Sequence, residues 1–301
     1  MIKKIDQGDD FFRLSKNSIV TLKRSIDNFG LLDPPILLRR DDRYVIVFGH
    51  NRIKVLVELD YEYIDSLVLD CIPDRLFLEY ILLKSLRGEI GPIGRIKAIN
   101  ILKNYFGLNN EILSTVSKYL NIPDELIRRD ELYENIVNLP VILQDYLDIK
   151  EIGYKAIKNI FYIPSEGISL LIDWIIVTNM RINIFKNIVD YIIDIYKRDG
   201  NLNSLRDIDV STIQDRREKE NHLFDRIFRV RYPEYSGLRE RAEGIVKRFK
   251  GMGVQISYPK YFEGETIKLT FNISNREDIE SIMDRFKKID MKAIAELREL
   301  L

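Results

Sequence analysis

The sequence has few of the residues that build covalent or metal-bound frameworks. It contains one cysteine, Cys71, and two histidines, His50 and His222. A single cysteine cannot form an intrachain disulfide, and these three residues lack the spacing of a zinc site. One unpaired thiol is typical of a reducing compartment. Because Cys71 ends an apolar run, we expect a buried, unreactive thiol in a strand rather than a nucleophile.

An excess of charge of one sign and long apolar runs are also missing. The chain has 47 basic and 47 acidic residues, so its formal net charge is zero and no overall positive field steers it to nucleic acid. The longest apolar stretch, Ile168–Val177, is interrupted by Asp173 and is too short for a membrane span. Asp9 and Asp10 precede any apolar segment that could act as an export signal. We therefore expect a cytoplasmic protein without a membrane partner.

The sequence does contain a strand that leads through a glycine into a helix. Tyr44–Phe48 has the pattern of a short strand, Gly49 follows it, and an amphipathic helix begins near His50-Asn51-Arg52. The free N–H groups and the dipole at the start of a helix favour negative charge, so this junction predicts an anion site. The alternative interpretation is a turn glycine that is needed for its positive φ and binds nothing.

The flanking segments complete a small α/β domain of roughly the first 90 residues. The patterns predict, in order, helix Leu22–Phe29, strand Ile36–Arg39, a turn at Asp41-Asp42, strand Tyr44–Phe48, helix Ile53–Leu59 and strand Asp65–Cys71. This order resembles the N-terminal domain of the ParB/sulfiredoxin superfamily. In that family a helix, a Gly-x-x-x-Pro segment, a hairpin and a Gly-x-x-Arg helix start together enclose a nucleotide. Gly30, Pro34, Gly49 and Arg52 occupy the matching positions.

Three departures from the family pattern limit what the resemblance implies. Partition ParB proteins have Gly-Glu-Arg-Arg at the helix start, where this chain has Gly-His-Asn-Arg. Their Glu-Asn-x-x-Arg box, which serves the metal ion and CTP hydrolysis, aligns with residues 83–87, where only Arg87 is kept. The leucine and lysine found at the other two positions cannot bind Mg²⁺. Sulfiredoxins place a reactive cysteine after the motif glycine, where this chain has His50.

The departures argue against CTP hydrolysis by the ParB mechanism and against sulfiredoxin chemistry. They leave triphosphate binding through Arg52 and Arg87 open. The catalytic residues, if the chain is an enzyme, are not identified, no metal site is assigned, and the need for Mg²⁺ stays open.

From Pro92 onward the pattern changes to helices, which predicts an all-helical middle domain. Apolar residues recur at helical spacing in Ile93–Tyr105, Glu111–Leu120, Asp124–Val137, Val141–Leu147, Ile152–Phe161, Ser165–Trp174 and Ile182–Tyr196. Within this series, a helix, a turn at residues 121–123 and a second helix match a helix-turn-helix. It lies where ParB-like chains have theirs. The candidate DNA contacts in it are Ser117, Lys118, Arg128 and Arg129.

The charge of this unit is unfavourable for DNA. Its presumed recognition helix, Asp124–Asn135, carries two basic and five acidic residues, a net charge of −3. Phosphate contacts need the opposite sign. The alternative is an ordinary bundle helix whose charges are solvated.

A basic surplus lies nearer the C-terminus. Residues 216–250 carry eleven basic and six acidic side chains, a net charge of +5. Arg226, Arg229 and Arg231 alternate there with Phe228 and Tyr232, a pattern that fits a nucleic-acid face with stacking partners. The alternative is an amphipathic helix that ends at Pro233, with arginines extended over apolar neighbours.

The last part of the chain predicts a small α/β unit. We expect helix Leu238–Phe249, strands Val254–Tyr258 and Thr266–Ile273, and helix Asp278–Ile289. Packing of the hairpin on the helices explains this unit, and a dimer contact is a further use. The fold class is therefore α+β, with predicted domains at residues 1–90, 91–215 and 216–301.

The resemblance implies a ParB-like DNA-binding protein that responds to a nucleotide, CTP or ATP. It would act in DNA partition, nucleoid organisation or regulation, as a nucleoid-associated protein and a homodimer. In this interpretation Gly49, His50, Asn51 and Arg52 hold phosphates, Gly30 and Pro34 shape the base side, and Arg87 closes the pocket. One alternative is a nucleotide-dependent kinase of the same superfamily that acts on a small substrate such as serine. Another is a non-catalytic adaptor.

Overall fold

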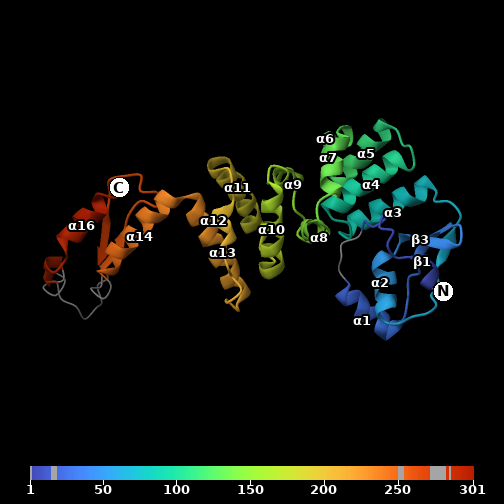
Figure 1. The fold of residues 1–301 in the computed structure, drawn as a ribbon, viewed down its shortest axis with the longest axis horizontal. Helices are drawn as coiled ribbons and strands as arrows, with labels where there is room; N and C mark the ends of the chain where they lie inside the picture. The colour runs from blue at the N-terminus through green and yellow to red at the C-terminus, as the bar shows by residue number, and fades with distance from the viewer. Residues whose placement is uncertain (1, 15–18, 250–253, 272–282, 285) are drawn as a thin grey trace.

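The computed structural model describes residues 2–14, 19–249, 254–271, 283–284 and 286–301. The fold is α+β, as predicted. The molecule is elongated, with the N-terminal domain at one end, the C-terminal unit at the other and a series of helices between them (Figure 1). Across the described ranges, no helix combines the length and the apolar character that crossing a membrane requires.

The N-terminal domain is built on a four-stranded sheet. Its elements are the 3-10 turn Ile2–Lys4, β1 (Ile5–Asp6), α1 (Val20–Phe29), β2 (Ile36–Arg40), β3 (Arg43–Phe48), α2 (His50–Glu58), β4 (Leu67–Leu69) and α3 (Asp74–Leu86). The strand order is β1-β3-β2-β4, in which β2 and β3 form an antiparallel hairpin and the outer strands pair in parallel. Asp41 has a φ of +52° in the hairpin turn, which confirms the turn expected there.

The alternation of side chains along β3 divides the core of this domain between two faces. Val45 and Val47 pack into the same cluster as Phe77 of α3. Ile46 faces the other way, into a second cluster with residues of α1 and α2, among them Ile26. The sheet is therefore covered on both faces, and α2 starts directly at the end of its central strand.

One expectation about this domain is wrong. Cys71 is exposed and follows β4 instead of being a buried strand residue. Strand β4 ends at Leu69, two residues earlier than the apolar run suggests, and so leaves the thiol on a surface turn.

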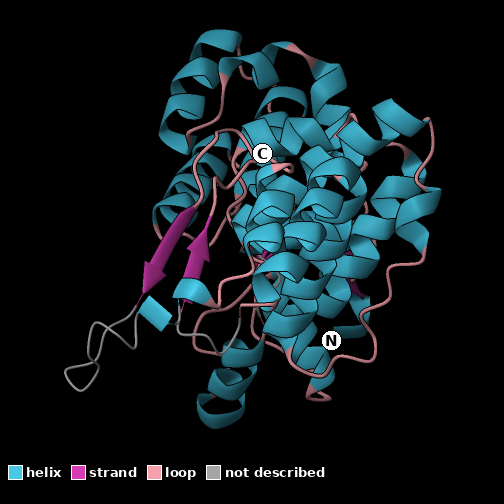
Figure 2. Ribbon diagram, turned by 90° about the vertical axis from the view of Figure 1, so that its left-hand side faces the viewer, coloured by secondary structure: helices cyan, strands magenta, loops and turns pink. Residues whose placement is uncertain are grey.

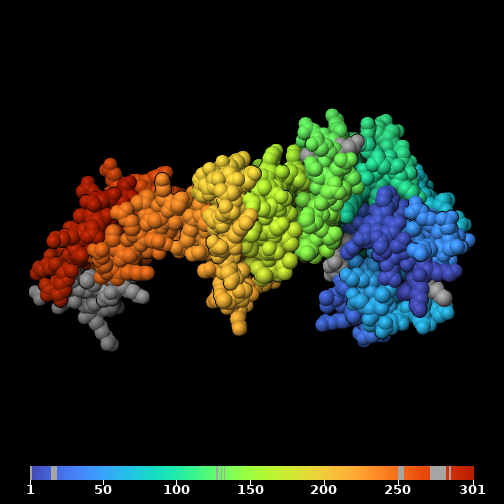
Figure 3. Space-filling model, in the orientation of Figure 1, coloured from blue at the N-terminus to red at the C-terminus, as the bar shows by residue number. Residues whose placement is uncertain are grey.

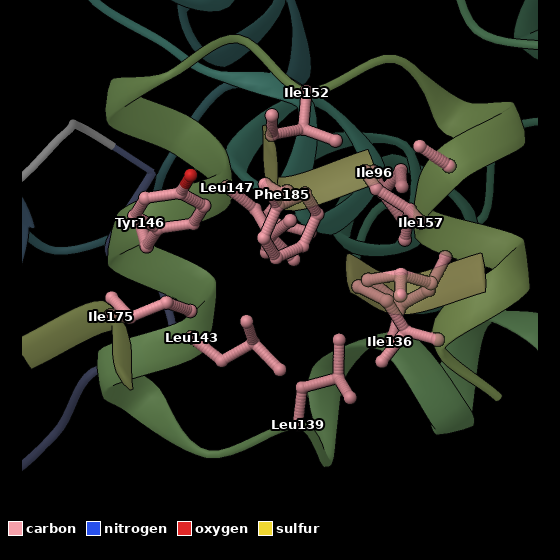
Figure 4. Close-up of a cluster of buried hydrophobic side chains, with 14 of the residues drawn as sticks. Ile96, Ile136, Leu139, Leu143, Tyr146, Leu147, Ile152, Ile157, Ile175 and Phe185 are labelled. Atoms are coloured by element: carbon pink, nitrogen blue, oxygen red, sulfur yellow. The ribbon is translucent and has the colours of Figure 1, made fainter. Parts of the chain in front are cut away.

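The middle of the chain is helical, as expected. Its helices are α4 (Pro92–Asn104), α5 (Asn110–Leu120), α6 (Asp124–Arg128), α7 (Asp130–Val137), α8 (Val141–Ile149), α9 (Tyr154–Ile160), α10 (Ser165–Thr178), α11 (Ile182–Asp199), α12 (Asn203–Arg206) and α13 (Arg216–Arg231). Their buried side chains form one continuous cluster, which begins in the N-terminal domain at Phe12 and extends to Ile227. Figure 4 shows the part of this cluster around Leu143, Leu147 and Phe185.

A buried carboxylate fixes the start of α4. Asp148 of α8 is 8% exposed, and its Oδ1 accepts a hydrogen bond of 2.6 Å from the backbone N–H of Ile93. The carboxylate thus caps a helix that lies 55 residues earlier in the chain. The two helices approach so closely that a Cβ on Gly91 would lie 2.5 Å from Asp148 Oδ1. Burial is the main cause that raises the Asp148 pKa to about 6.

The C-terminal unit has a hydrophobic core of its own. It consists of α14 (Pro233–Lys247), the antiparallel strands β5 (Val254–Ser257) and β6 (Lys268–Phe271), and α16 (Met291–Arg298). Its cluster runs from Ala242 to Leu300 and does not include residues of the larger core. Figure 2 shows the hairpin from this end of the molecule, and Figure 3 shows the narrower section that joins the unit to the helices.

The two strands lie within the predicted ranges, whereas α14 begins at Pro233, five residues before the predicted start, and α16 is an additional helix. The predicted helix 278–289 lies largely outside the described residues. Helix α13 buries Leu223 and Ile227 in the larger core, so its apolar face packs with the middle helices, although Arg229 also pairs with Glu240 of α14. The domain boundary before residue 216 stays a prediction, but the packing groups α13 with the preceding helices.

Candidate functional site

The junction between β3 and α2 requires a glycine for two reasons. Gly49 has a φ of +103°, which side chains disfavour. A Cβ at this position would also lie 2.8 Å from the Pro35 Cβ. The residue precedes α2 without providing a side-chain cap, and the first turn of a helix has N–H groups that lack intrahelical acceptors. The junction therefore offers the helix start to an anion, as the sequence predicts.

A cavity of about 580 Å³ lies at this helix start. It is bounded by α1, by the first turn of α2 and by the end of α3 together with the turn that follows. The lining residues are Thr21, Leu22, Ser25, Gly49, His50, Asn51, Arg52, Tyr80, Lys84, Gly88 and Glu89. Its volume is within the range of small-molecule sites.

Two largely buried cations line the cavity. Arg52 pairs with Asp33, and Lys84 pairs with Glu89. In each pair the cation is the less exposed partner, with side-chain exposures of 18% for Arg52 and 14% for Lys84 against 70% and 40% for the two acids. Both cations are thus held at the wall, Asp33 faces solvent and Glu89 also lines the cavity, so an entering anion would compete with those carboxylates.

An aromatic pair forms a second wall. The ring of Tyr80 stacks on Phe48, with centroids 3.4 Å apart, and the Lys84 ammonium lies 5.5 Å from the centroid of the Tyr80 ring. Phe48 is the residue before Gly49, so the stack connects the end of β3 to α3. The arrangement places a flat apolar surface beside the cationic groups, as a ligand with both a ring and a phosphate requires.

His50 enters the cavity as a neutral imidazole. Burial is the main cause that lowers its pKa to about 4, although Asp10 and the Asp9 backbone favour the charged form. Its Nε2 is buried and forms no hydrogen bond within the described part of the chain. A neutral ring can offer one hydrogen bond to a ligand, but it adds no charge to the cavity.

The structure brings four of the predicted site residues to the cavity, and their binding of a nucleotide stays a prediction. Gly49, His50, Asn51 and Arg52 line the cavity, whereas Gly30, Pro34 and Arg87 do not. Pro34 is exposed, and Arg87 is exposed at the C-cap of α3. Lys84 lies in the cavity instead, because it is four residues after Tyr80 and on the same helix face. That spacing could have identified Lys84 as a cavity residue from the sequence. No sequence pattern identified Thr21 and Ser25 of α1.

Within the described ranges, no group of three or more His, Cys, Asp or Glu side chains is arranged to hold a metal ion.

The helix-turn-helix prediction needs two corrections. Helix α5, a turn with Asn121 in the left-handed region and α6 follow one another as expected. However, α6 has five residues and ends at Arg128, because Arg129 is extended (φ −119°, ψ 95°) and α7 starts after it. Ser117 is fully buried, and its hydroxyl donates to the Ser114 carbonyl, so it cannot contact DNA. Lys118, Arg128 and Arg129 are exposed.

Two of the three arginines that the sequence indicates near the C-terminus form ion pairs within the protein. Arg229 pairs with Asp225 and Glu240. Arg231 pairs with Asp194 at 2.9 Å, and its guanidinium lies 4.6 Å from the Tyr232 ring centroid. DNA binding by these two arginines stays a prediction, and it would require phosphates to compete with the carboxylates that already pair with them. Arg226 is exposed and forms no ion pair within the described ranges.

This difference predicts that substituting Arg231 lowers the stability of the protein more than substituting Arg226. Arg231→Ala removes an ion pair and a cation–π contact and is expected to lower the free energy of unfolding by about 1 kcal/mol. Arg226→Ala is expected to change it by less than about 0.5 kcal/mol. Urea unfolding of the two variants beside the parent protein measures both values. Equal effects would contradict the assignment of Arg231 to the fold.

Comparison with known proteins places the N-terminal domain in a family. Residues 2–86 match the model of the ParB N-terminal domain family. Among solved structures, the chain is similar to the C-terminally truncated chromosome-partitioning protein ParB from Caulobacter crescentus, complexed to the centromeric parS site. The two share 14% identity with a TM-score of 0.29, and the match covers 63% of this chain and 96% of that chain. No curated protein matches.

Proposed function

We propose that this chain, which carries a ParB-like N-terminal domain at residues 2–86, binds a nucleotide in the cavity at the start of α2 and binds DNA through its helical part. Such a protein would act in DNA partition, nucleoid organisation or regulation. The nucleotide is CTP or ATP, and its binding would control the interaction with DNA.

The observation that carries the proposal is the meeting of three anion-binding features in one cavity. The uncapped start of α2, the Arg52 guanidinium and the Lys84 ammonium all lie at its wall. A helix start and two cations suit a polyphosphate, and the stacked Tyr80 ring suits a base. The family match of residues 2–86 supports the same interpretation.

The nucleotide part is tested by calorimetric titration of the protein with CTP, ATP and ADP, each with and without Mg²⁺. Selective binding of CTP supports a partition-like protein. Since the residues at the metal-side positions of the family box are Leu83 and Lys84, we expect Mg²⁺ to have little effect on affinity. Absence of binding by all three nucleotides would contradict the proposal.

The DNA part rests on the order α5–turn–α6 and on exposed cations. Lys118, Arg128, Arg129 and Arg226 are exposed, although Arg129 lies 3.4 Å from Glu125. Binding to duplex DNA should weaken steeply with salt, because phosphate contacts release counterions. Fluorescence anisotropy at several salt concentrations measures this dependence.

One observation keeps the kinase alternative open. The acidic residues Asp9 and Asp10 lie near His50, a residue of the cavity wall, although neither lines the cavity, and phosphoryl transfer needs a positioned base. Asp10, however, is 3.3 Å from the guanidinium of Arg13. Preference for ATP or ADP in the titration, followed by phosphorylation of free serine, would favour the kinase over the DNA-binding protein.

A further inference from the structure

Two hollows flank helix α9 in the middle of the molecule. The larger one, of about 390 Å³, lies between α6 and α9, and the smaller one, of about 260 Å³, lies between α9 and α11. Lys155 and Asn159 of α9 line both. The hollows therefore form one surface that crosses α9, and we name it the α9 surface. Its further basic residues are Lys158 in the larger hollow and Lys186 in the smaller one.

The acidic groups of the α9 surface are already held by neighbours. Glu125 is 2.7 Å from the ammonium of Lys158, and this contact is the main cause that lowers the Glu125 pKa. Asp190 accepts a hydrogen bond of 3.0 Å from the Asn159 side chain. Lys155 and Lys186 are exposed and form no ion pair with any residue that the structure describes. The Asn159 amide does not neutralise Asp190, so Lys155, Lys158 and Lys186 against Glu125 and Asp190 give the surface a net charge of +1.

Helix α9 also changes the charge around the helix-turn-helix. The sequence assigns a net charge of −3 to residues 124–135. In the fold, the acidic residues Glu131 and Glu134 belong to the separate helix α7. Helix α9 lies next to α6 and places Lys155 and Lys158 beside it. These lysines are about 30 residues from α6 in the sequence, so a count of charges along residues 124–135 does not include them.

We propose that the phosphate backbone of duplex DNA lies across the α9 surface and is contacted by Lys155 and Lys186. The inference rests on the proposed DNA-binding function and adds a contact region outside both segments that the sequence indicated. Lysine ammonium groups on flexible stems suit phosphate oxygens, which carry no base information, so this contact adds affinity without sequence preference. A DNA backbone is the chosen occupant because Lys155 also lines the hollow beside α6 of the helix-turn-helix, and Lys186 lines the adjoining hollow together with it.

The test measures the salt dependence of binding to a duplex of random sequence by fluorescence anisotropy. The full-length double variant Lys155→Gln/Lys186→Gln is expected to lower the slope of log K against log salt by about 1 for each lysine. The double variant Lys155→Arg/Lys186→Arg should keep the parent slope, since it keeps both charges. Both substituted positions are on the surface, so circular dichroism and thermal unfolding of the two variants should match the parent protein.

The matched control is Lys4→Gln/Lys292→Gln, which removes the same charge from exposed lysines outside the α9 surface. Its slope should equal that of the parent. Equal slopes for the α9 variant and this control, with a parent protein that binds DNA, would overturn the inference alone. A parent protein that fails to bind duplex DNA would overturn the proposed DNA function and this inference together.

Discussion

Arg52→Ala is expected to weaken nucleotide binding by about 10- to 150-fold, because a charge-assisted hydrogen bond to phosphate is worth about 1.5–3 kcal/mol. Arg52 is the cation closest in sequence to the helix start, and its side chain is 18% exposed at the wall of the cavity. Its pair with Asp33 contributes little to stability because Asp33 is 70% exposed. The variant should therefore stay folded. Calorimetric titration with the nucleotide that binds the parent protein gives the result.

Two further variants make this measurement specific. Arg24→Ala removes an exposed arginine from α1, outside the cavity lining, and should leave affinity unchanged. Arg52→Lys keeps the charge but loses the planar fork, so its affinity should lie between the other two. Parent-like affinity of Arg52→Ala would show that the Gly49 junction is only a structural turn.

Asp148→Ala is expected to lower the free energy of unfolding by about 2–4 kcal/mol, the cost of a lost helix cap and of buried N–H groups left without acceptors. The Ile93 N–H, which donates to this carboxylate, belongs to a residue that is 1% exposed. Water therefore cannot replace the lost acceptor. Urea unfolding followed by circular dichroism measures the change.

Asp148→Asn keeps a side-chain acceptor for the helix cap but removes the ionisable group. Comparing this variant with the parent protein therefore tests how the Asp148 carboxyl group makes stability depend on pH. Burial raises the folded pKa of Asp148 from 3.8 to about 6, against the opposing effect of the N–H groups of Ile93 and Gly94 and of nearby Lys97. The folded state therefore binds this proton more readily than the unfolded state. Its contribution to stability is present below about pH 4 and is lost as the pH rises through about 6.

The expected result is a stability difference between the parent and Asp148→Asn that changes across this interval by about 2–3 kcal/mol, in favour of the asparagine at higher pH. The asparagine keeps an acceptor oxygen for Ile93. Parallel pH profiles of the two proteins would show that the carboxyl group titrates normally in the fold.

Local patterns were sufficient to predict the fold class and the helix start of the site. A strand, a glycine with positive φ and a helix with a polar first turn are neighbours in the chain, so Gly49–Arg52 could be identified directly. Lys84 and Ser25 come from other helices and meet this turn only after the sheet is covered. Sequence order does not contain that information.

Charge patterns were the least reliable signal, because the sequence does not show which charges are paired. Arg231 looks available in the chain, yet its partner Asp194 lies on α11. Lys155 is about 30 residues from α6 in the sequence, and only the fold brings it beside that helix. Ser117 was assigned to the surface, although its hydroxyl turns inward to the Ser114 carbonyl.

The separate cores have a consequence for heat denaturation. Any ligand that binds only the folded state raises the melting temperature of every region that unfolds together with its site. The sheet beside the cavity packs on one face against the apolar cluster that extends to Ile227, which Tyr80 contacts, and on the other face against the cluster that Leu22 contacts, whereas the cluster of Ala242 to Leu300 shares no residue with either. A calorimetric scan should therefore contain two transitions, and a bound nucleotide should move the larger one and leave the smaller one in place.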